Sequence, residues 1–364
     1  MKAVILAGGK ATRLLPITDN LPKAMVPVLD TPLLEHLIQH LRRHQITEII
    51  LALGNLAGPI TAYFSDGSRF GVKLNYAIEN TPLGTAGGIK NAERFLNETF
   101  IALNGDVFTD LDITAMLAFH REKRATATIA LTRVEDPTSF GVIETDIEGR
   151  VLSFREKPSR GEITGNMINA GTYILEPEVL TLIPAGTQVS IEREVFPSLL
   201  SHGTPVYAYP SSGYWLDIGT HEKYLQVHRD LLSGKCPQYA LDLGHGVFIG
   251  AGCNLHPSAH ITGPVVIGAN CLIGREVKLI GPSVIGAGCN IMRNSIVDSS
   301  ILWPNTHVGP RAIVKHSILA DHCHLNADSI VEESVLGNHV TVCSGYRLAP
   351  GSQVSSGSTA GDTP

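Results

Sequence analysis

Two different rhythms of apolar residues divide the 364-residue chain near residue 240. Before that point, short apolar runs alternate with patterns of helical spacing, and the strand-like runs lie at 4–6, 49–53, 74–78, 100–103, 126–131 and 169–175. Strands that alternate with helices form parallel sheets with helices on both faces. The pattern therefore predicts an α/β domain of Rossmann-like type over residues 1–235, with a mostly parallel, doubly wound sheet.

The most regular helical pattern lies at residues 32–45. Its apolar residues, spaced by three and four, are Leu33, Leu34, Leu37, Ile38 and Leu41. Thr31 can cap this helix, and Pro32 suits its first position because proline has no N–H to leave unpaired. We expect a helix that begins at Pro32 and buries its apolar face.

The second rhythm repeats every sixth residue and begins after about Gly244. Its large members are Ile249, Leu255, Ile261, Ile267, Ile273, Leu279, Ile285, Ile291 and Val297, and a second row of smaller residues lies two positions earlier. Alternate residues of a strand share a face, so each hexapeptide supplies two inward side chains, and three hexapeptides make one three-sided coil. We expect a left-handed parallel β-helix over residues 244–345.

The six-residue pattern changes towards the C-terminal end. Beyond Val297 the large inward residues continue with several five-residue steps, at Leu302, Val308, Val314, Leu319, Leu325, Val331, Leu336 and Val342. We expect the coil to continue with irregular corners. The last stretch, 351–364, lacks apolar residues to bury, and we expect a disordered or loose terminus there.

Composition and charge exclude several classes of protein. The net charge of -6 gives no electrostatic footprint for nucleic acid. The first apolar run is broken by Gly8-Gly9-Lys10, and no run approaches the ~20 residues of a membrane span. We expect a cytoplasmic protein with no nucleic-acid or membrane partner.

All six cysteines lie in the C-terminal part of the chain, and none has CxxC spacing. Disulfides and a zinc site are therefore not expected. Cys253, Cys271 and Cys289 are separated by three hexapeptides each, so they take equivalent places in successive coils. We interpret them as stacked free thiols in the core of the β-helix.

Residues 7–28, AGGKATRLLPITDNLPKAMVPV, directly follow the first apolar run. Gly8 and Gly9 can let backbone N–H groups approach an anion, because glycine has no Cβ. Three polar side chains of the same loop suit phosphate oxygens, namely Thr12, Arg13 and Lys23. The loop is neither a Walker A motif nor a dinucleotide fingerprint, since G-K-[ST] and G-x-G-x-x-G are both missing.

This loop resembles the signature of the sugar-1-phosphate nucleotidylyltransferases, G-G-x-G-T-R-L followed by P-K. The resemblance continues through ENTPLGTAGGI (79–89), NGDVFTD (104–110), FGVIETDIEGRVLSFREKP (140–158), NAGTYI (169–174) and YWLDIGTHEKY (214–224). A hexapeptide domain also occurs in the mannose-1-phosphate guanylyltransferase branch of that family. One departure is Ala11, where the signature commonly has glycine; a requirement for positive φ would strain the loop there by about 1 kcal/mol or more.

The resemblance implies that an NTP and a sugar 1-phosphate condense to an NDP-sugar and pyrophosphate. The attacking phosphate oxygen is already an anion, so no activating base is required, and catalysis should rest on cations and positioning. By resemblance, Arg13 holds the leaving β- and γ-phosphates, Lys23 acts near the α-phosphate, and Lys157 holds the incoming sugar phosphate.

The other site residues also follow from the resemblance. Asp106 and Asp217 are the carboxylates expected to hold Mg2+, which prefers hard oxygen ligands. The implied nucleotide-binding residues are Leu6, Ala7, Gly8, Gly9, Thr12, Gly84 and Thr85, and the implied sugar-binding residues are Gly141, Glu156 and Asn169. Asp110 and Asp112 are expected to cap the helix that follows.

Several alternatives stay open at this stage. The segment PLGTAGG (82–88) resembles guanylyltransferases more than thymidylyl or uridylyl members, and this resemblance favours GTP. Mannose 1-phosphate is the preferred sugar, and a glucose-1-phosphate thymidylyl- or uridylyltransferase is the alternative. Eight histidines within 245–339 raise a bifunctional nucleotidyl- and acyltransferase, and a non-catalytic regulatory relative would keep the same fold. We expect a homo-oligomer that associates through the β-helix.

Overall fold

The computed structural model describes residues 1–9, 11–163, 165–239 and 246–361. Its contacts divide the chain into two compact units, Met1–Lys10 with Leu34–Leu216 and Ala11–Leu33 with Asp217–Pro364. This division differs from the expected boundaries of 1–235 and 244–345. Residues 11–33, which contain most of the polar loop, belong by their contacts to the same unit as the C-terminal coil.

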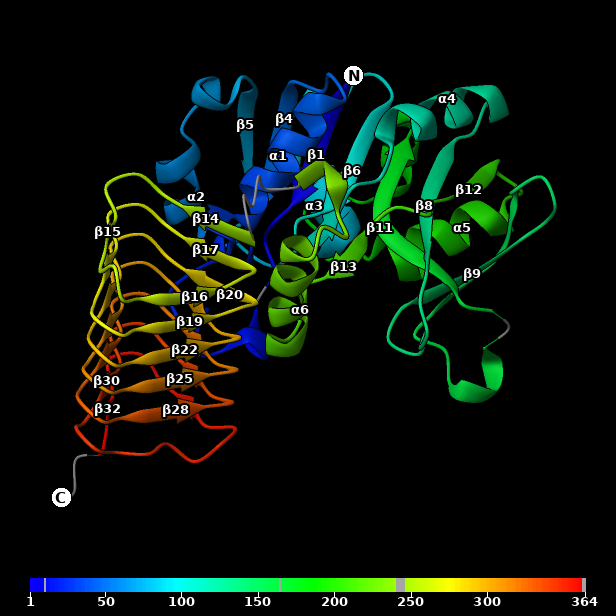
Figure 1. Cartoon of the computed structure of the whole chain (residues 1–364). Coiled ribbons are helices and arrows are strands. Elements are labelled where there is room, and N and C mark those ends of the chain that lie inside the picture. Colours follow the sequence, from blue (N-terminus) through cyan, green and yellow to red (C-terminus); the bar gives the residue numbers. More distant parts are fainter. Residues whose placement is uncertain (10, 164, 240–245, 362–364) are drawn as a thin grey trace. The chain divides into compact units, whose positions relative to one another are not determined.

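The first unit is built on a mixed sheet, which has nine strands within the described residues (Figure 1). The main path is β10 (Val151–Glu156), β9 (Gly141–Thr145), β11 (Met167–Leu175), β6 (Phe100–Asn104), β1 (Lys2–Leu6), β4 (Glu48–Leu53) and β5 (Lys73–Ile78). β8 (Ala127–Arg133) pairs with β11, and β12 (Val206–Pro210) pairs with β8. A separate two-stranded pair joins β7 (Val107–Thr109) and β13 (Trp215–Asp217).

The predicted fold class is confirmed, but the sheet is less parallel than expected. β1, β4, β5 and β6 run parallel, whereas β11 is antiparallel to β6, β8 and β9. Apolar runs identify strands without fixing their direction, so the sequence pattern did not reveal this reversal. On the parallel side, Ala3, Val4 and Ile5 are all fully buried, as expected for a strand covered on both faces.

The helices of the first unit are short and lie between the strands. They are α1 (Leu33–Arg43), α2 (Ala57–Phe64), α3 (Gly84–Asn91), α4 (Ile113–Lys123) and α5 (Phe196–Ser201). Shorter helical segments are η3 (Ser68–Phe70), η4 (Glu93–Phe95), η5 (Arg160–Glu162), η6 (Pro177–Leu182) and the π-helical η7 (Ile191–Val195). α3 packs on β1, β4 and β5, and α4 packs on β8 and β12. None of the described helices is long and apolar enough to span a membrane.

The apolar face predicted for the first helix is confirmed, because Leu33, Leu34, Leu37, Ile38 and Leu41 are each at most 2% exposed. Its predicted start is wrong. Thr31–Pro32 form β3, which pairs with β2 (Pro27–Val28), and the helix begins one residue later. Thr31, which we expected to cap the helix, instead has the extended backbone of a short hairpin strand.

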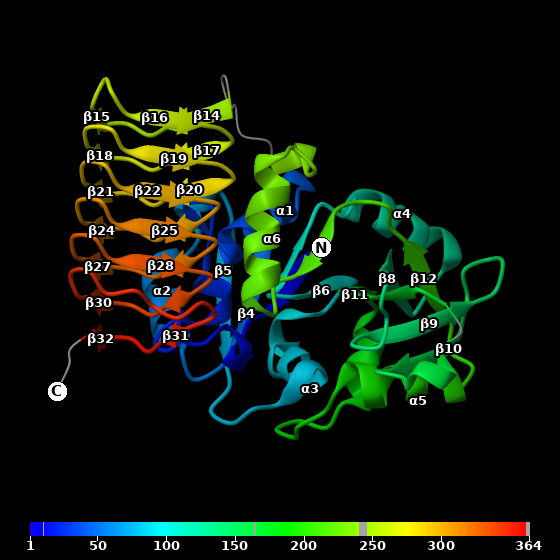
Figure 2. The ribbon, with the colours of Figure 1, turned by 60° about the horizontal axis from the view of Figure 1, so that its bottom comes forward.

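The second unit is a three-sided solenoid of short parallel strands, the expected β-helix (Figure 2). One face comprises β14 (Val247–Ile249), β17 (Val265–Ile267), β20 (Ser283–Ile285), β23 (Ile301–Leu302), β26 (Ile318–Leu319), β29 (Val335–Leu336) and β31 (Gln353–Val354). The next comprises β15 (Asn254–Leu255), β18 (Leu272–Ile273), β21 (Asn290–Ile291), β24 (His307–Val308), β27 (His324–Leu325), β30 (Thr341–Val342) and β32 (Thr359–Ala360). The third comprises β16 (His260–Thr262), β19 (Lys278–Ile280), β22 (Ile296–Asp298), β25 (Ile313–Lys315) and β28 (Ile330–Glu332).

The irregular corners expected beyond Val297 are present. Val265 pairs with Ser283, whereas Val284 pairs with Ile301, so the later coil is shorter by a single position. Each shortened corner carries a left-handed residue, Ser299, His316 or Glu333, followed by a buried serine. The buried serines form a ladder in which the N–H groups of Ser300, Ser317 and Ser334 donate to the hydroxyls of Ser283, Ser300 and Ser317 at 3.1–3.2 Å. These bonds satisfy backbone groups that the missing residue would otherwise leave unpaired.

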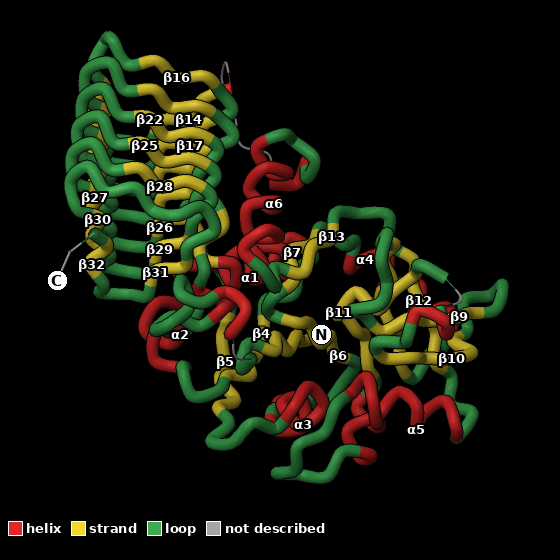
Figure 3. Tube along the Cα trace, turned by 90° about the horizontal axis from the view of Figure 1, so that it is seen from below, coloured by secondary structure: helices red, strands yellow, loops and turns green. Residues whose placement is uncertain are grey.

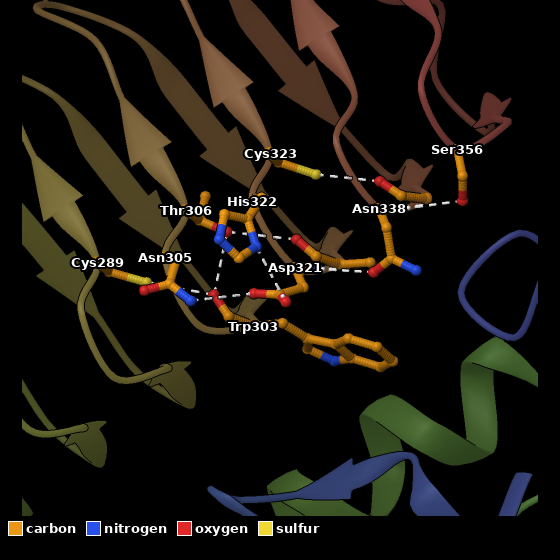
Figure 4. Close-up of polar contacts among 11 residues, drawn as sticks. Cys289, Trp303, Asn305, Thr306, Asp321, His322, Cys323, Asn338 and Ser356 are labelled. Carbon is orange, nitrogen blue, oxygen red and sulfur yellow. Dashed lines mark hydrogen bonds and ion pairs between the residues drawn. The ribbon is translucent and has the colours of Figure 1, made fainter. Parts of the chain in front are cut away.

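The expected stack of free thiols is also present, and Figure 4 shows its member Cys289. Cys271 Sγ donates to the carbonyl of Gly286 at 3.2 Å, and Cys289 Sγ donates to the carbonyl of Trp303 at 3.3 Å. Thr306 takes the next place, with its hydroxyl on the Trp303 carbonyl. The inward cysteines therefore serve as small core residues with a weak donor.

The C-terminal stretch forms a further coil, which corrects our expectation of a disordered tail from 351 to 364. Val335 N–H bonds to Ser352, and Thr341 N–H bonds to Ser358, at 2.8 and 3.0 Å. Val354 and Ala360 pack against the core of the solenoid. A terminal coil needs only backbone partners and small inward residues, so its low apolar content was misleading. Residues 362–364, and the expected start of the β-helix at 244, lie outside the described part of the chain.

Further segments of the second unit are the helical turns η1 (Thr12–Leu14), η2 (Lys23–Met25) and η8 (Pro237–Tyr239). They are joined by helix α6 (His221–Leu232), which is labelled in Figure 3. α6 is capped by Thr220, whose hydroxyl accepts from the N–H of Lys223 at 3.3 Å. Its buried face includes Tyr224, Val227 and His228.

Candidate active site

In the first unit, the loop after β1 passes close to the loop after β6. The N–H of Gly105 donates to the carbonyl of Leu6 at 2.9 Å, and Ala7 N–H donates to Ala52. Asp106 follows at the carboxyl end of β6, half-buried, where open α/β sheets bind ligands. The predicted carboxylate and the predicted base-binding backbone are thus neighbours at one sheet end.

Gly8 is tightly enclosed, whereas Gly9 is not. A Cβ on Gly8 would lie 3.0 Å from Oε1 of Glu79 and 3.1 Å from the N of Gly54. A Cβ on Gly9 would meet open space. Close packing therefore explains only the first glycine. Ala11 has φ of -91°, so the departure from the signature causes no backbone strain.

Gly84 opens α3 with φ of 72°, and a Cβ there would lie 2.6 Å from the carbonyl oxygen of Val189. The next residue, Thr85, is already engaged by the protein. Its hydroxyl donates to Glu192 Oε2 at 2.7 Å and accepts from Ile191 N–H at 2.9 Å. The proton of the Thr85 hydroxyl is thus committed to Glu192.

Glu79 was not predicted as a site residue, yet it borders the same loop. Its Oε2 accepts from the N–H of Leu83 at 3.2 Å, and its Oε1 faces Gly8. Burial raises the pKa of Glu79. Leu83 N–H is the one hydrogen-bond donor to this carboxylate among the described residues. The segment ENTPLGTAGG contained this signal, because its acidic residue precedes the glycines by only a few positions.

The predicted sugar-binding residues lie on adjoining strands of the same unit. Glu156 of β10 is the cross-strand partner of Gly141 in β9, and a Cβ on Gly141 would lie 2.8 Å from Glu156 Oε2. Asn169 donates to the hydroxyl of Tyr173 at 2.8 Å and accepts from Gly171 N–H at 2.9 Å. Burial and then the charge of Glu192 raise the pKa of Glu156.

Glu192 is a second residue that sequence reasoning missed. Its carboxylate accepts from the hydroxyls of Thr85 and Ser190, each at 2.7 Å, and from Tyr173 Oη at 3.3 Å. It therefore links a predicted nucleotide-binding residue to the partners of Asn169. Glu192 lies in a π-helical turn, a rare geometry that is frequent at functional sites and leaves no motif in the sequence.

Lys157 follows β10 in a left-handed conformation, with φ of 51°. Its N–H donates to the carbonyl of Phe140 at 3.0 Å, and its Nζ lies 4.0 Å from Glu156 Oε1. The side chain is 57% exposed. The backbone of Lys157 is therefore held in place, while its ammonium group is accessible to solvent.

In the second unit, three of the predicted residues gather around Gly219. Lys23 Nζ lies 3.5 Å from Asp217 Oδ1. A Cβ on Gly219 would lie 3.0 Å from Arg13 Nη2 and 3.2 Å from Asp217 Oδ2. Thr12 and Arg13 are exposed in η1. The segment 11–33 and the start of α6 thus place two cations beside one carboxylate.

The expected caps of α4 are half right. Asp112 accepts from the N–H of Ala115 at 2.9 Å and caps the helix. Asp110 instead accepts from the backbone N–H of Tyr214. Asp110 holds the strand pair β7 and β13 rather than a helix end.

A mixed α/β sheet with glycine-lined loops at its carboxyl edge, and a chain that continues into a hexapeptide solenoid, define an α/β nucleotidyltransferase. The family model described as "Nucleotidyl transferase" matches residues 2–234, and the model "EIF2B subunit epsilon LbH domain" matches residues 244–348. The chain belongs to the nucleotidyl transferase family.

Several relatives share most of their length with this chain. A UTP–glucose-1-phosphate uridylyltransferase of Synechocystis sp. is 39% identical over 328 residues, covering 85% of this chain and 84% of the relative. A mannose-1-phosphate guanylyltransferase of Mycobacterium tuberculosis is 39% identical over 286 residues, covering 72% and 79%. HddC from Yersinia pseudotuberculosis, solved in complex with GMP-PN, is 31% identical with a TM-score of 0.54, covering 62% of this chain and 97% of that structure.

Proposed function

We propose that the protein condenses GTP with a sugar 1-phosphate, preferably mannose 1-phosphate, to form an NDP-sugar and pyrophosphate. The nucleotide choice rests on Glu79. Guanine presents two neighbouring donors, N1–H and the N2 amino group, which a carboxylate accepts as a pair. Uracil and thymine present one such donor between two carbonyl oxygens, which a carboxylate repels. Two relatives support the choice, the guanylyltransferase of Mycobacterium tuberculosis and HddC with GMP-PN.

The proposed chemistry needs no protein base. A sugar-phosphate oxygen forms a bond to the α-phosphorus while the bond from that phosphorus to the pyrophosphate oxygen breaks in line. In this mechanism Arg13 neutralises the leaving phosphates, Lys23 acts near the α-phosphate, and Lys157 holds the incoming phosphate. Glu156 and Asn169 would take sugar hydroxyls, and Gly141 would let the ring approach the backbone.

Magnesium fits the donor set of this site. Asp106 and Asp217 would hold it, and both supply the hard oxygen ligands that Mg2+ prefers. Bound Mg2+ would neutralise phosphate charge during the transfer. The close approach of Lys23 to Asp217 supports a shared task, since cation and carboxylate would then arrange the same phosphates.

The second candidate is a uridylyltransferase acting on glucose 1-phosphate, and the Synechocystis relative favours it. Two further hypotheses have less support. His322 lies 3.0 Å from Asp321 and is stacked on His339, while His307 is stacked on His324. A non-catalytic relative would be expected to lose a metal carboxylate or phosphate-binding cation.

The decisive experiment is a pyrophosphate-release screen of four NTPs against mannose, glucose and N-acetylglucosamine 1-phosphates with Mg2+. We expect GTP with mannose 1-phosphate to give the largest kcat/KM. A preference for UTP with glucose 1-phosphate would select the second candidate. Turnover of acetyl-CoA would instead support the bifunctional hypothesis.

We further propose that the protein is a homo-oligomer that associates through the β-helix. Short solenoids have open ends and flat faces, and Phe248 and Ile249 of the first coil are 40% and 49% exposed. Size-exclusion chromatography with light scattering at micromolar concentration tests this. Elution as a monomer would contradict it.

A further inference from the structure

The segment 11–33 is bonded both to α6 and to the β-helix, all within the second unit. Trp303, at the corner after β23, donates through Nε1 to the hydroxyl of Tyr224 on α6 at 2.9 Å. That hydroxyl in turn donates to the backbone carbonyl of Pro27. Trp303 is 4% exposed and Tyr224 is fully buried. A chain of two hydrogen bonds therefore leads from the solenoid to the loop that carries Arg13 and Lys23.

The polarity of this chain is fixed. The indole N–H can only donate, so the tyrosine oxygen must accept from it and use its own proton for Pro27. Burial raises the pKa of Tyr224, which keeps the hydroxyl protonated. The relay thus has one arrangement rather than several, which favours a single position of the loop.

His228, one turn later on α6, makes a parallel connection. Its Nδ1 lies 2.7 Å from the carbonyl of Tyr224, and its Nε2 accepts from the N–H of Leu29 at 3.0 Å. These partners assign the proton to Nδ1. The loop is therefore held at two nearby backbone groups, the carbonyl of Pro27 and the amide of Leu29.

Two carboxylates of the loop reach the coils directly. Burial raises the pKa of Asp30 and the backbone of Ala287 opposes that rise, while the N–H of Ser356 bonds to Asp19 Oδ2 at 3.4 Å. Ser356 is itself held in place, because its hydroxyl accepts from the N–H of Asn338 at 3.0 Å (Figure 4). The contacts with the loop thus span several levels of the solenoid.

We propose that Trp303 and Tyr224 are positioning residues, through which the β-helix holds the loop of Arg13 and Lys23 in its phosphate-binding arrangement. This inference rests on the proposed roles of those two cations. Neither positioning residue need touch substrate. A flexible loop would have to order itself at each turnover, so loss of the relay should lower kcat more than it raises KM.

Tyr224→Phe and Trp303→Phe test the relay. Tyr224→Phe removes both bonds and leaves a buried indole N–H without an acceptor, so we expect kcat to fall about five- to fiftyfold. Trp303→Phe leaves the bond to Pro27 possible and should have a smaller effect. Because the two residues act through one chain, the double variant should lose less than the product of the two single losses.

Ser317→Ala is the matched control. It removes a buried hydroxyl that accepts from Ser334 N–H at 3.1 Å and donates to the carbonyl of Lys315 at 2.6 Å, both within the solenoid. Ser317→Ala should lower the thermal midpoint of unfolding about as much as Tyr224→Phe does, while leaving kcat unchanged. Assays use whichever NTP and sugar phosphate the unmodified protein turns over fastest.

Hydrogen exchange of the full-length protein gives a readout that does not require activity. Tyr224→Phe and Trp303→Phe should speed amide exchange within residues 22–30, and Ser317→Ala should not. Unchanged exchange there, or kcat values equal to that of the control, would overturn the proposed positioning. Absence of turnover in the unmodified protein would instead contradict the proposed function, and the exchange comparison would still decide the relay.

Discussion

The α/β unit and the interior of the solenoid differ in the polar side chains that they bury and in how these side chains are hydrogen-bonded. In the α/β unit, Glu79 and Glu156 are half-buried carboxylates whose pKa values are raised, because burial removes solvent from them. In the solenoid, the buried polar side chains are neutral and bonded to backbone, as in the serine ladder and the thiol stack. The first pattern costs stability and indicates binding; the second stabilises the coil and indicates structure.

The largest expected effect comes from removing a phosphate-binding cation. Arg13→Ala should lower kcat/KM about 100- to 1,000-fold, the usual loss when one transition-state donor is removed. Steady-state pyrophosphate release measures it. Arg311→Ala is the control, since that exposed arginine pairs with Asp328 on the solenoid at 2.6 Å and should leave kcat/KM unchanged. Equal effects of the two variants would remove the assigned role of Arg13.

The solenoid core should respond in stability rather than in specificity. Leu325 is fully buried, so Leu325→Ala should lower the free energy of unfolding by about 2–5 kcal/mol. Leu272→Ala is the matched control because its side chain is 48% exposed, and it should change stability little. Denaturant titration compares them. A similar loss in both would mean that the inward row is assigned wrongly.

Glu79→Gln tests whether a half-buried carboxylate of the α/β unit selects the nucleotide. We expect kcat/KM for GTP to fall about 10- to 100-fold, because an amide replaces one of two acceptors by a donor facing guanine. The loss for UTP should be smaller, so the ratio of the two values is the measurement. Glu93→Gln is the control, because Glu93 is an exposed carboxylate whose Oε1 lies 2.7 Å from Nζ of Lys90. An unchanged ratio would contradict the proposed readout.

The smallest expected effect is on the pH dependence of stability, and it has opposite signs in the two regions. The folded pKa of Glu156 is raised above 4.5, so its stabilising contribution is present below pH 4.5 and lost as pH rises through the raised value. Glu156→Gln should therefore raise the thermal midpoint at pH 7 and not at pH 4. Glu276, bonded to Asn294 and Arg275 on the solenoid, has a lowered pKa.

For Glu276 the contribution is present above pH 4.5 and lost as pH falls through the lowered value. Glu276→Gln should thus lower the thermal midpoint slightly at pH 7 and have no effect at low pH. Calorimetric scans from pH 3.5 to 7.5 compare the two variants. Shifts of the same sign at pH 7 would refute the contrast between the regions.

The sequence revealed most where local pattern and structure coincide. The buried face of the helix from Leu33 to Leu41 and the inward rows of the solenoid follow from spacing alone, because a regular spacing places these residues on one face of their element. The antiparallel direction of β11 and the presence of the terminal coil could not be predicted in this way. Neither strand direction nor backbone pairing with a preceding coil produces a pattern of apolar residues.

The candidate site was predicted only in part. Glycines such as Gly8 and Gly84 are recognisable because close packing or positive φ excludes other residues. Glu192 was missed because its role depends on contacts that no motif in the sequence records, whereas Glu79 lies in the segment ENTPLGTAGG and was not singled out there. The bonds from Trp303 to Tyr224 and from Ser356 to the loop could not be predicted either, because they too depend on contacts between distant parts of the chain.

The bond from Ser356 to the loop, and the link from Trp303 to the same loop through Tyr224, limit how the number of repeats in this solenoid can change. Coils of a repeat protein contact mainly their neighbours, so one coil can in principle be gained or lost without unfolding the rest. Loss of one coil between Trp303 and Ser356 would move the last bonding point by about 4.8 Å along the axis. The length of the solenoid is therefore constrained by the loop, a segment that lies outside the repeats.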